Sequence, residues 1–369
     1  MNKYAADKKN RLTLKSTVQI LCFLVTCVFV WQFASYMLVT KSGASYSSKT
    51  FDSIPENTVD AFFIGASSTW NGVSPLTLWQ QTGMTSYAFA ANTCPPQVEY
   101  LHLKEALKSQ RPKVVFICTQ FLVVKQKKDL IELRALQSMI NRKLTIDKVI
   151  TCVQIAKDVN VATGVKTLLP LLAYHDNWKN IQASDFFVDS DGEYMGENCE
   201  HFYHRNYTDT IDEMLVRSNP VPGKVYKYNE VAIKYYRKMI KLCKDNGIQP
   251  VLVTMPLYVG FKAHGALRNF ADEEGIKYFN FNEPQYIKSI NLDNTLEWRD
   301  GVHMNFWGAV KFSRWFGAFA EDKFDFPDRR SPSDPSYDVW FGHYSQFYEH
   351  FSRIMPNTFI PPEKIVAEK

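Results

Sequence analysis

The chain has 369 residues, of which 46% are hydrophobic and 22% are charged. This composition excludes an intrinsically disordered protein and is enough for one large domain or two small ones. The net charge is +5, and five basic residues lie within the first fifteen positions. No long basic stripe remains elsewhere, so a nucleic acid is not expected as a partner.

An uncharged hydrophobic segment follows the basic N-terminal tail at residues 16–40. It is long enough to cross about 30 Å of hydrocarbon as a helix. A cleaved signal peptide is the main alternative, but its apolar region is usually only about 7–15 residues long. A buried core helix fits less well, because basic residues crowd one flank only. We expect a single-pass anchor that contacts membrane lipid, with residues 1–15 in the cytoplasm and the main domain extracellular.

A polar tether is expected at residues 41–58, and a regular alternation of strands and helices begins after it. Apolar runs predict strands at residues 59–64, 86–90, 113–118, 251–254 and 278–281. Helical patterns lie between and after them, at residues 75–81, 96–109, 229–246, 262–274 and 305–322. Ser74, Pro75 and Gly83 are typical start and stop signals for the first of these helices. The repeated order predicts a flavodoxin-like three-layer α/β/α domain with a parallel central sheet, at residues 59–323.

Two segments depart from this alternation. Residues from about 125 to 224 contain a basic helical stretch and an irregular polar region, and we interpret them as an inserted cap over the site. Residues 324–369 form a C-terminal extension with little periodicity, in which Asp328, Arg329 and Arg330 are expected to make charge contacts with the domain.

The seven cysteines include two in the anchor and no C-x-x-C pair. Their spacing supports neither a zinc site nor a thioredoxin-type redox site. We expect buried, unpaired thiols. The alternative is a single disulfide, which the oxidising environment outside the cytoplasm would permit. His201 and His204 lie close together, but no acidic residue at ligand spacing completes a metal site. We therefore expect no metal and no cofactor, and a substrate-facing loop at this position.

Two short motifs carry candidate chemistry. Ser67 follows a buried strand and Gly65, so it lies on a strand-to-helix turn at the carboxyl end of the sheet, where ligands bind in open α/β folds. Near the other end of the domain, Asp300 precedes His303 by three residues. An aspartate in that position can hold the imidazole tautomer that accepts a serine proton. Each motif has a structural alternative, namely a turn serine and a solvent-exposed turn.

Taken together, the two motifs resemble those of the SGNH/GDSL hydrolases. The similarity is to the membrane-tethered bacterial branch, which has Gly-Ser-Ser near the start and Asp-x-x-His-x-Asn-x-x-Gly-Ala near the end. The resemblance implies that Ser67 is the nucleophile, His303 the general base and Asp300 its orienting carboxylate. Ser68 is the alternative nucleophile. The resemblance also implies ester chemistry through an acyl-enzyme.

The sequence departs from the family pattern in the middle of the site. Ala66 replaces the usual aspartate of Gly-Asp-Ser, and the expected glycine and asparagine blocks are absent near residues 90–93 and 118–120. The Ser67 amide would still serve as one oxyanion donor. Asn92 and Gln120 are the candidates for a side-chain donor.

The resemblance implies an esterase or O-acyltransferase that acts on a cell-envelope polysaccharide or a teichoic-acid-like polymer. Such proteins can work beside a polytopic membrane O-acyltransferase. Hydrolysis and transfer are not separated by the sequence, although an anchor close to the membrane favours transfer. Two alternatives stay open: a non-catalytic glycan-binding or scaffold protein of the same fold, and a teichoic-acid D-alanylation protein.

Overall fold

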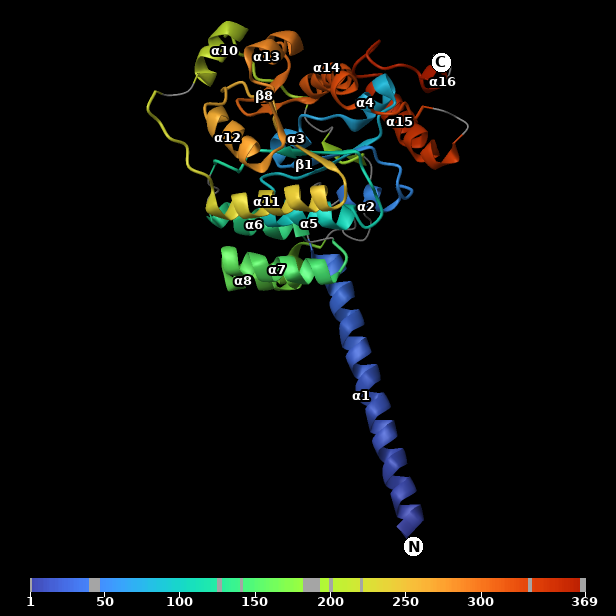
Figure 1. Cartoon of the computed structure of the whole chain (residues 1–369). Helices are drawn as coiled ribbons and strands as arrows, with labels where there is room; N and C mark the ends of the chain where they lie inside the picture. Colours follow the sequence, from blue (N-terminus) through green and yellow to red (C-terminus); the bar gives the residue numbers. More distant parts are fainter. Residues whose placement is uncertain are drawn as a thin grey trace.

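The computed structural model describes residues 2–39, 47–124, 128–139, 142–181, 193–198, 202–219, 222–330 and 334–365. At its centre lies a parallel sheet of five strands in the order β2-β1-β3-β6-β7 (Figure 1). The strands are β1 (Ala61–Gly65), β2 (Ser86–Ala90), β3 (Val114–Cys118), β6 (Gln249–Thr254) and β7 (Lys277–Asn280). By sequence order this is 2-1-3-4-5, the flavodoxin-like arrangement, whose topological switch point lies between the first and third strands. The predicted fold class is therefore confirmed.

The central strands are buried on both faces. In β1, Phe62 and Ile64 belong to the core on one side of the sheet, whereas Ala61 and Phe63 belong to the core on the other side. All five residues of this strand are buried. A parallel strand covered by helices on both faces reads as a continuous apolar run rather than an alternating one. The run of Ala, Phe, Phe and Ile is explained by that position.

Helices cover both faces of the sheet (Figure 1). On one side lie α5 (Pro96–Ala106), α11 (Glu230–Asp245) and α6 (Lys128–Met139), and on the other lie α4 (Pro75–Thr82) and α14 (Phe306–Phe324). The expected caps of α4 are present. Ser74 Oγ accepts a hydrogen bond from the amide of Thr77, and Gly83 adopts a left-handed conformation with φ 78°. Two further helices, α12 (His264–Glu274) and α13 (Pro284–Ile290), follow β6 and β7.

The described residues of the predicted insertion include α6 and several further elements in different parts of the molecule. The helices α7 (Ile146–Asp158) and α8 (Val161–Leu168) form an additional layer beneath α5 and α6 (Figure 1). The short α9 (Leu171–Tyr174) and the 3-10 helix η2 (His175–Asn180) continue this layer, and β4 (Glu193–Tyr194) and β5 (Glu197–Asn198) form a small antiparallel pair. The chain then reaches α10 (Ile211–Ser218), at the opposite end of the molecule.

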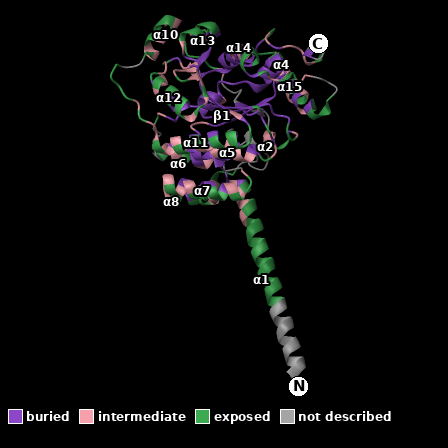
Figure 2. Ribbon diagram, viewed as in Figure 1, coloured by how far each residue is buried: buried purple, intermediate pink, exposed green. Residues whose placement is uncertain are grey.

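The N-terminal helix α1 (Asn2–Leu38) projects from the base of the globular part (Figures 1 and 2). Its segment Lys15–Leu38 is long and apolar enough to cross a membrane, and it is exposed along most of its length. A signal sequence would satisfy the same criterion. Residues 41–46 of the predicted tether lie outside the described residues. The next residues form α2 (Ser47–Asp52), in which Phe51 contacts Phe62 and Phe89 of the core.

The C-terminal extension is more regular than expected. It forms η4 (Pro335–Tyr337), α15 (Asp338–Phe351) and α16 (Pro362–Ile365). The buried residues of α15 recur at helical spacing: Trp340, Tyr344, Phe347 and Phe351. The expectation of little periodicity was therefore wrong, because further aromatic residues of α15, such as Phe341 and Tyr348, obscure the stripe that faces α4. The expected charge contacts are present, since Arg329 pairs with Asp60 at 3.0 Å.

Candidate active site

Ser67 is the first residue of α3 (Ser67–Trp70), a single turn that follows β1 directly. Gly65 allows this sharp entry. A Cβ at that position would lie 2.4 Å from Thr69 Oγ1 and 2.6 Å from Cys118 Cβ, so any side chain would push α3 away from β3. The Ser67 amide lies in the first turn of α3, where helical N–H groups have no intrahelical acceptor. The serine is thus held at the carboxyl end of β1, beside the switch point of the sheet.

Asp300 and His303 belong to a tight hairpin that was not predicted from the sequence. It consists of β8 (Trp298–Asp300) and β9 (His303–Met304), in which Asp300 pairs with His303. The Val302 amide donates to Asp300 Oδ1 at 2.9 Å, which fixes the carboxylate within the turn. Directly after the hairpin, Asn305 caps α14 by accepting from the Gly308 amide. The hairpin that carries Asp300 and His303, and the start of α14 directly after it, therefore position these two side chains.

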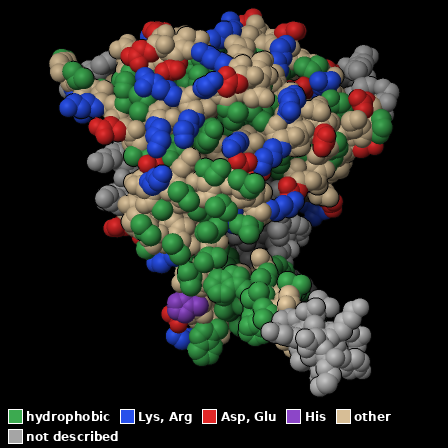
Figure 3. Space-filling model, turned by 60° about the horizontal axis from the view of Figure 1, so that its bottom comes forward, with side chains coloured by type: hydrophobic (Ala, Val, Ile, Leu, Met, Phe, Trp, Pro, Cys, Tyr) green, Lys and Arg blue, Asp and Glu red, His purple; other side chains and the backbone are tan. Residues whose placement is uncertain are grey.

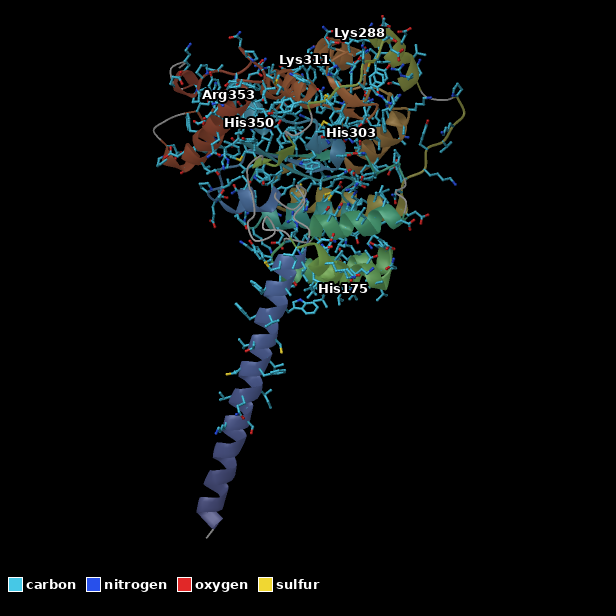
Figure 4. The ribbon with its side chains drawn as sticks, turned by 180° about the vertical axis from the view of Figure 1, so that it is seen from behind. His175, Lys288, His303, Lys311, His350 and Arg353 are labelled. Carbon is cyan, nitrogen blue, oxygen red and sulfur yellow. The ribbon has the colours of Figure 1, made fainter. Side chains whose placement is uncertain are left out.

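The three residues form one continuous chain of contacts. His303 Nε2 lies 2.8 Å from Ser67 Oγ, and His303 Nδ1 lies 2.8 Å and 2.9 Å from the two oxygens of Asp300. A proton on Nδ1 that is donated to the carboxylate leaves Nε2 as the acceptor for the serine hydroxyl. Ser67 is 4% exposed, and the His303 side chain is 13% exposed. Figure 4 shows His303 within the body of the domain, above the layer formed by α6.

Electrostatics keep Asp300 ionised. Burial alone would raise the pKa of its carboxyl group. Hydrogen bonds from His303 and from the Val302 amide, together with the charges of His303 and Arg299, overcome this effect and lower the pKa well below its usual value. An ionised carboxylate at this position can orient the imidazole and stabilise the imidazolium that forms when a proton is taken from serine.

Arg299 is a site residue that the sequence analysis missed. Its Nε donates to Asp300 Oδ2 at 3.2 Å, its Nη1 donates to Asn71 Oδ1 at 3.1 Å, and its Nη2 lies 2.9 Å from His303 Nδ1. Asn71 in turn donates from Nδ2 to the carbonyl oxygen of Ser67 at 2.7 Å. These contacts join the Ser67 turn to the hairpin. The signal for this residue in the sequence is an arginine directly before the Asp-x-x-His motif. Its partner Asn71 lies 228 residues away, so the sequence does not reveal the contact.

Ser68, the alternative nucleophile, has different partners. Its Oγ donates to Gln120 Oε1 at 2.9 Å and lies 3.5 Å from Cys118 Sγ. Gln120 follows β3, so the structure brings it to the same edge of the sheet as the Ser67 turn. Because Oε1 accepts from Ser68, the amide nitrogen of Gln120 is the group that could donate to an oxyanion. Asn92 follows β2 and accepts from Thr93 Oγ1 at 3.2 Å, and its role stays a prediction.

Within the described part of the chain, no hydrogen bond joins the remaining predicted groups directly to Ser67, His303 or Asp300. The thiols of Cys94, Cys118, Cys152 and Cys243 are buried and unpaired, and burial raises the pKa of the Cys118 thiol. Cys199 and His201 lie outside the described residues. The His204 ring contacts Trp307 on α14.

Comparisons with known proteins add little to this picture. No known family model and no curated protein matches the sequence. A solved structure of a candidate acylhydrolase from Bacteroides fragilis is similar at a TM-score of 0.34 and 12% sequence identity, over 77% of this chain and 100% of the other. A likeness at this level does not establish a shared function.

Proposed function

We propose that this chain is a serine-dependent enzyme that hydrolyses or transfers acyl esters, as in the SGNH/GDSL hydrolases that its motifs resemble. One observation carries the proposal. Ser67, His303 and Asp300 come from opposite ends of the domain, yet they form an unbroken series of contacts at 2.8 Å between serine and histidine and 2.8 Å between histidine and aspartate. A turn serine and an exposed turn histidine, the structural alternatives, would have no reason to meet in this order.

The proposed reaction has two steps. His303 Nε2 takes the proton of Ser67 as Oγ attacks the carbonyl carbon of the ester, and the same proton then goes to the departing alkoxide. The acyl group is left on Ser67 Oγ. In the second step a water molecule or a sugar hydroxyl gives its proton to Nε2 and attacks the carbonyl carbon of the acyl-enzyme. The bond between that carbon and Ser67 Oγ then breaks, and Nε2 returns the proton to Oγ. The choice between water and a sugar hydroxyl decides between hydrolysis and transfer.

The proposed setting is the outer face of a cell membrane. Lys15–Leu38 supports an anchor by length and composition, and the basic residues that precede it support a cytoplasmic N-terminus. A cell-envelope polysaccharide or teichoic-acid-like polymer is the proposed acyl donor or acceptor. A polytopic membrane O-acyltransferase is the proposed partner that would supply an activated acyl group.

A fluorophosphonate probe tests the chemistry on the full-length protein. We expect the wild type to be labelled, and Ser67→Ala and His303→Ala to lose labelling. Ser68→Ala is the comparison, because it removes the neighbouring hydroxyl and leaves Ser67 in place; we expect it to be labelled, but more slowly than the wild type, because Ser68 orients Gln120. Labelling of Ser67→Ala at the wild-type rate would refute the role of Ser67. A wild type that never reacts, with full biological activity in Ser67→Ala cells, would favour the non-catalytic alternative.

A second assay separates hydrolysis from transfer. The wild type is given an aryl acetate, and the release of the phenol is compared with the acetate found in solution and on an added oligosaccharide. Acetate recovered on sugar hydroxyls, at the expense of free acetate, would identify a transferase. Free acetate alone would identify a hydrolase.

A further inference from the structure

The helix α7 exposes an apolar face on its outer side. Its exposed residues recur at the spacing of one helical face: Ile146, Val149, Ile150 and Val153. The exposed fraction is 80% for Ile146 and 50% for Val153. The opposite side of α7 is buried and consists of Lys148, Thr151, Cys152 and Ile155, of which Cys152 and Ile155 belong to a hydrophobic core cluster. A surface helix of a water-soluble domain normally exposes polar residues on the side away from the core, so the apolar outer face of α7 is unusual.

The next helix also exposes apolar residues on its outer side. α8 buries Thr163, Gly164 and Thr167 and exposes Val161 and Val165, by 70% and 41%. Further along, Trp178 of η2 is 62% exposed. We call the exposed apolar side of α7, α8 and η2 the basal face, represented by Ile146, Val149, Val153, Val161, Val165 and Trp178. Figure 3 shows hydrophobic side chains gathered at the base of the globular part, around the root of α1.

The apolar helix α1 meets the domain at this same layer. It contacts α9 and η2, and Asn177 Nδ2 donates to the carbonyl oxygen of Leu38 at 2.7 Å. A cavity of about 520 Å³ lies between α1 and the layer that contains α7 and α8, with Ser35 and Val149 among its lining residues. The end of α1 and the basal face are therefore at one level of the molecule.

That level coincides with the expected boundary of the hydrocarbon. A helix rises about 1.5 Å per residue, so about 20 residues cross the roughly 30 Å core of a bilayer. Counted from Lys15, the last charged residue before the apolar segment, this length ends near Ser35. A bilayer crossed by α1 would therefore have its outer surface where α1 joins the domain. The exposed valines and isoleucines beside that junction would otherwise face water.

The charges of this layer also suit a membrane surface. Residues 142–181 contain six Lys and Arg and three Asp; Lys148 is buried, and the exposed charged residues are Lys143, Lys157, Lys166, Lys179 and Asp176, which gives a local excess of positive charge. Lys157 and Lys166 are exposed at the ends of α7 and α8. Apolar side chains flanked by basic ones, with an exposed tryptophan, are typical of elements that lie in the headgroup region of anionic bilayers.

We propose that the basal face rests on the outer surface of the membrane that α1 spans, with its apolar side chains in the headgroup region of anionic lipids. The inference depends on α1 as a membrane anchor, but not on the chemistry proposed for Ser67. It has a consequence for that site. Figure 4 shows His175 at the base of the globular part and His303 higher up, beyond the layer of α6. A domain whose basal face contacts the membrane would hold His303 at a fixed height above the lipid, where a polymer could reach His303.

Nitroxide accessibility in nanodiscs that contain phosphatidylglycerol tests this proposal with the full-length chain. Cys22, Cys27 and Cys199 are replaced by Ser, and single labels are introduced by Val153→Cys on the basal face and Arg353→Cys as a control. The Arg353 side chain is 79% exposed and lies in the upper part of the molecule (Figure 4). We expect the label at position 153 to be several-fold more accessible to oxygen, relative to a water-soluble nickel chelate, than the label at position 353.

A third label, introduced by Val25→Cys within α1, separates the possible failures. If position 25 is shielded from the nickel chelate and position 153 is as accessible to it as position 353, α1 spans the bilayer but the seating is refuted. If position 25 is also accessible to the chelate, the anchor fails and the seating fails with it. Strong dipolar coupling between labels at position 153, without oxygen contact, would assign the face to a second copy and refute the proposal. Fluorophosphonate labelling of Ser67 is read independently in each case.

Discussion

Arg299 Nη1 donates to Asn71 Oδ1 at 3.1 Å, across 228 residues of sequence. Asn71 holds the carbonyl oxygen of Ser67, and Arg299 also donates to Asp300. The Ser67 turn and the hairpin that carries Asp300 and His303 are thus connected twice. The first connection is the direct contact between Ser67 and His303, and the second runs through Asn71 and Arg299. The second connection sets the relative position of two segments that no strand pairing joins.

The first prediction concerns this arginine. Arg299→Gln removes the positive charge and most of the donors while leaving Ser67, His303 and Asp300 in place. We expect kcat to fall by roughly 10- to 100-fold with little change in KM, because a displaced nucleophile or base slows the chemical step. Steady-state kinetics with an aryl acetate measure both constants.

Arg353→Gln is the matched control, since Arg353 makes only an exposed surface pair with Glu349 among its described contacts. Arg299→Lys should recover part of the loss, because it restores the charge but not the planar set of donors. Equal kinetics for Arg299→Gln and Arg353→Gln would show that the connection through Asn71 has no role in catalysis.

The second prediction concerns the pH dependence of stability. The pKa of Asp300 is lowered in the folded protein, so its carboxylate stabilises the fold at every pH above its unfolded pKa of about 3.9. This contribution is lost progressively as the pH falls below that value toward the lower folded pKa. The difference in unfolding free energy between wild type and Asp300→Asn should therefore be constant from about pH 5 to pH 7 and smaller near pH 3.

Urea denaturation at these pH values measures the difference. Asp325→Asn provides a control, because the Asp325 side chain is fully exposed. A difference that grows on acidification would contradict the lowered pKa. The same Asp300→Asn protein should lose activity by up to about 10⁴-fold at pH 7, as expected when the wrong imidazole tautomer faces the serine.

The third prediction concerns the oxyanion donor. Gln120 is placed at the carboxyl end of β3 and oriented by Ser68, so its amide nitrogen is the better candidate. We expect Gln120→Ala to lower kcat by roughly 10²- to 10³-fold, the usual effect of removing one oxyanion donor. Asn92→Ala is the comparison, with a smaller loss expected. The reverse order of the two losses would assign the donor to Asn92.

The fourth prediction concerns the turn that carries Ser67. Gly65→Ala places a methyl group against Thr69 and Cys118 at distances below 3 Å. We expect a loss of about 1–3 kcal/mol in unfolding free energy, typical of overpacking, together with lower activity because α3 must shift. The urea midpoint and the rate of fluorophosphonate labelling report the two effects.

Gly342→Ala is the same substitution at a site with open space around it, within α15. There we expect a gain of about 0.5–1 kcal/mol, because alanine has less backbone freedom to lose in a helix. Equal effects at both positions would mean that the contacts around Gly65 are not limiting.

The sequence alone indicated the order of strands and helices and the two motifs of the site. Apolar runs such as residues 113–118 predict buried strands because parallel strands bury both faces, and Ser74 and Gly83 mark helix ends through local backbone chemistry. These are short-range effects, so they can be recognised from neighbouring residues. The resemblance in motifs then named Ser67, Asp300 and His303 together.

Only the tertiary structure decided how those residues meet. The 2.8 Å contact between Ser67 and His303 depends on the sheet order, which places β1 beside β3 and leaves the β8–β9 hairpin next to α3. Arg299 and Asn71 look like ordinary polar residues until the fold brings them together. The basal face likewise has unremarkable helical spacing in the sequence. Which side of α7 faces outward is set by its packing on α5 and α8, and no local pattern carries that information.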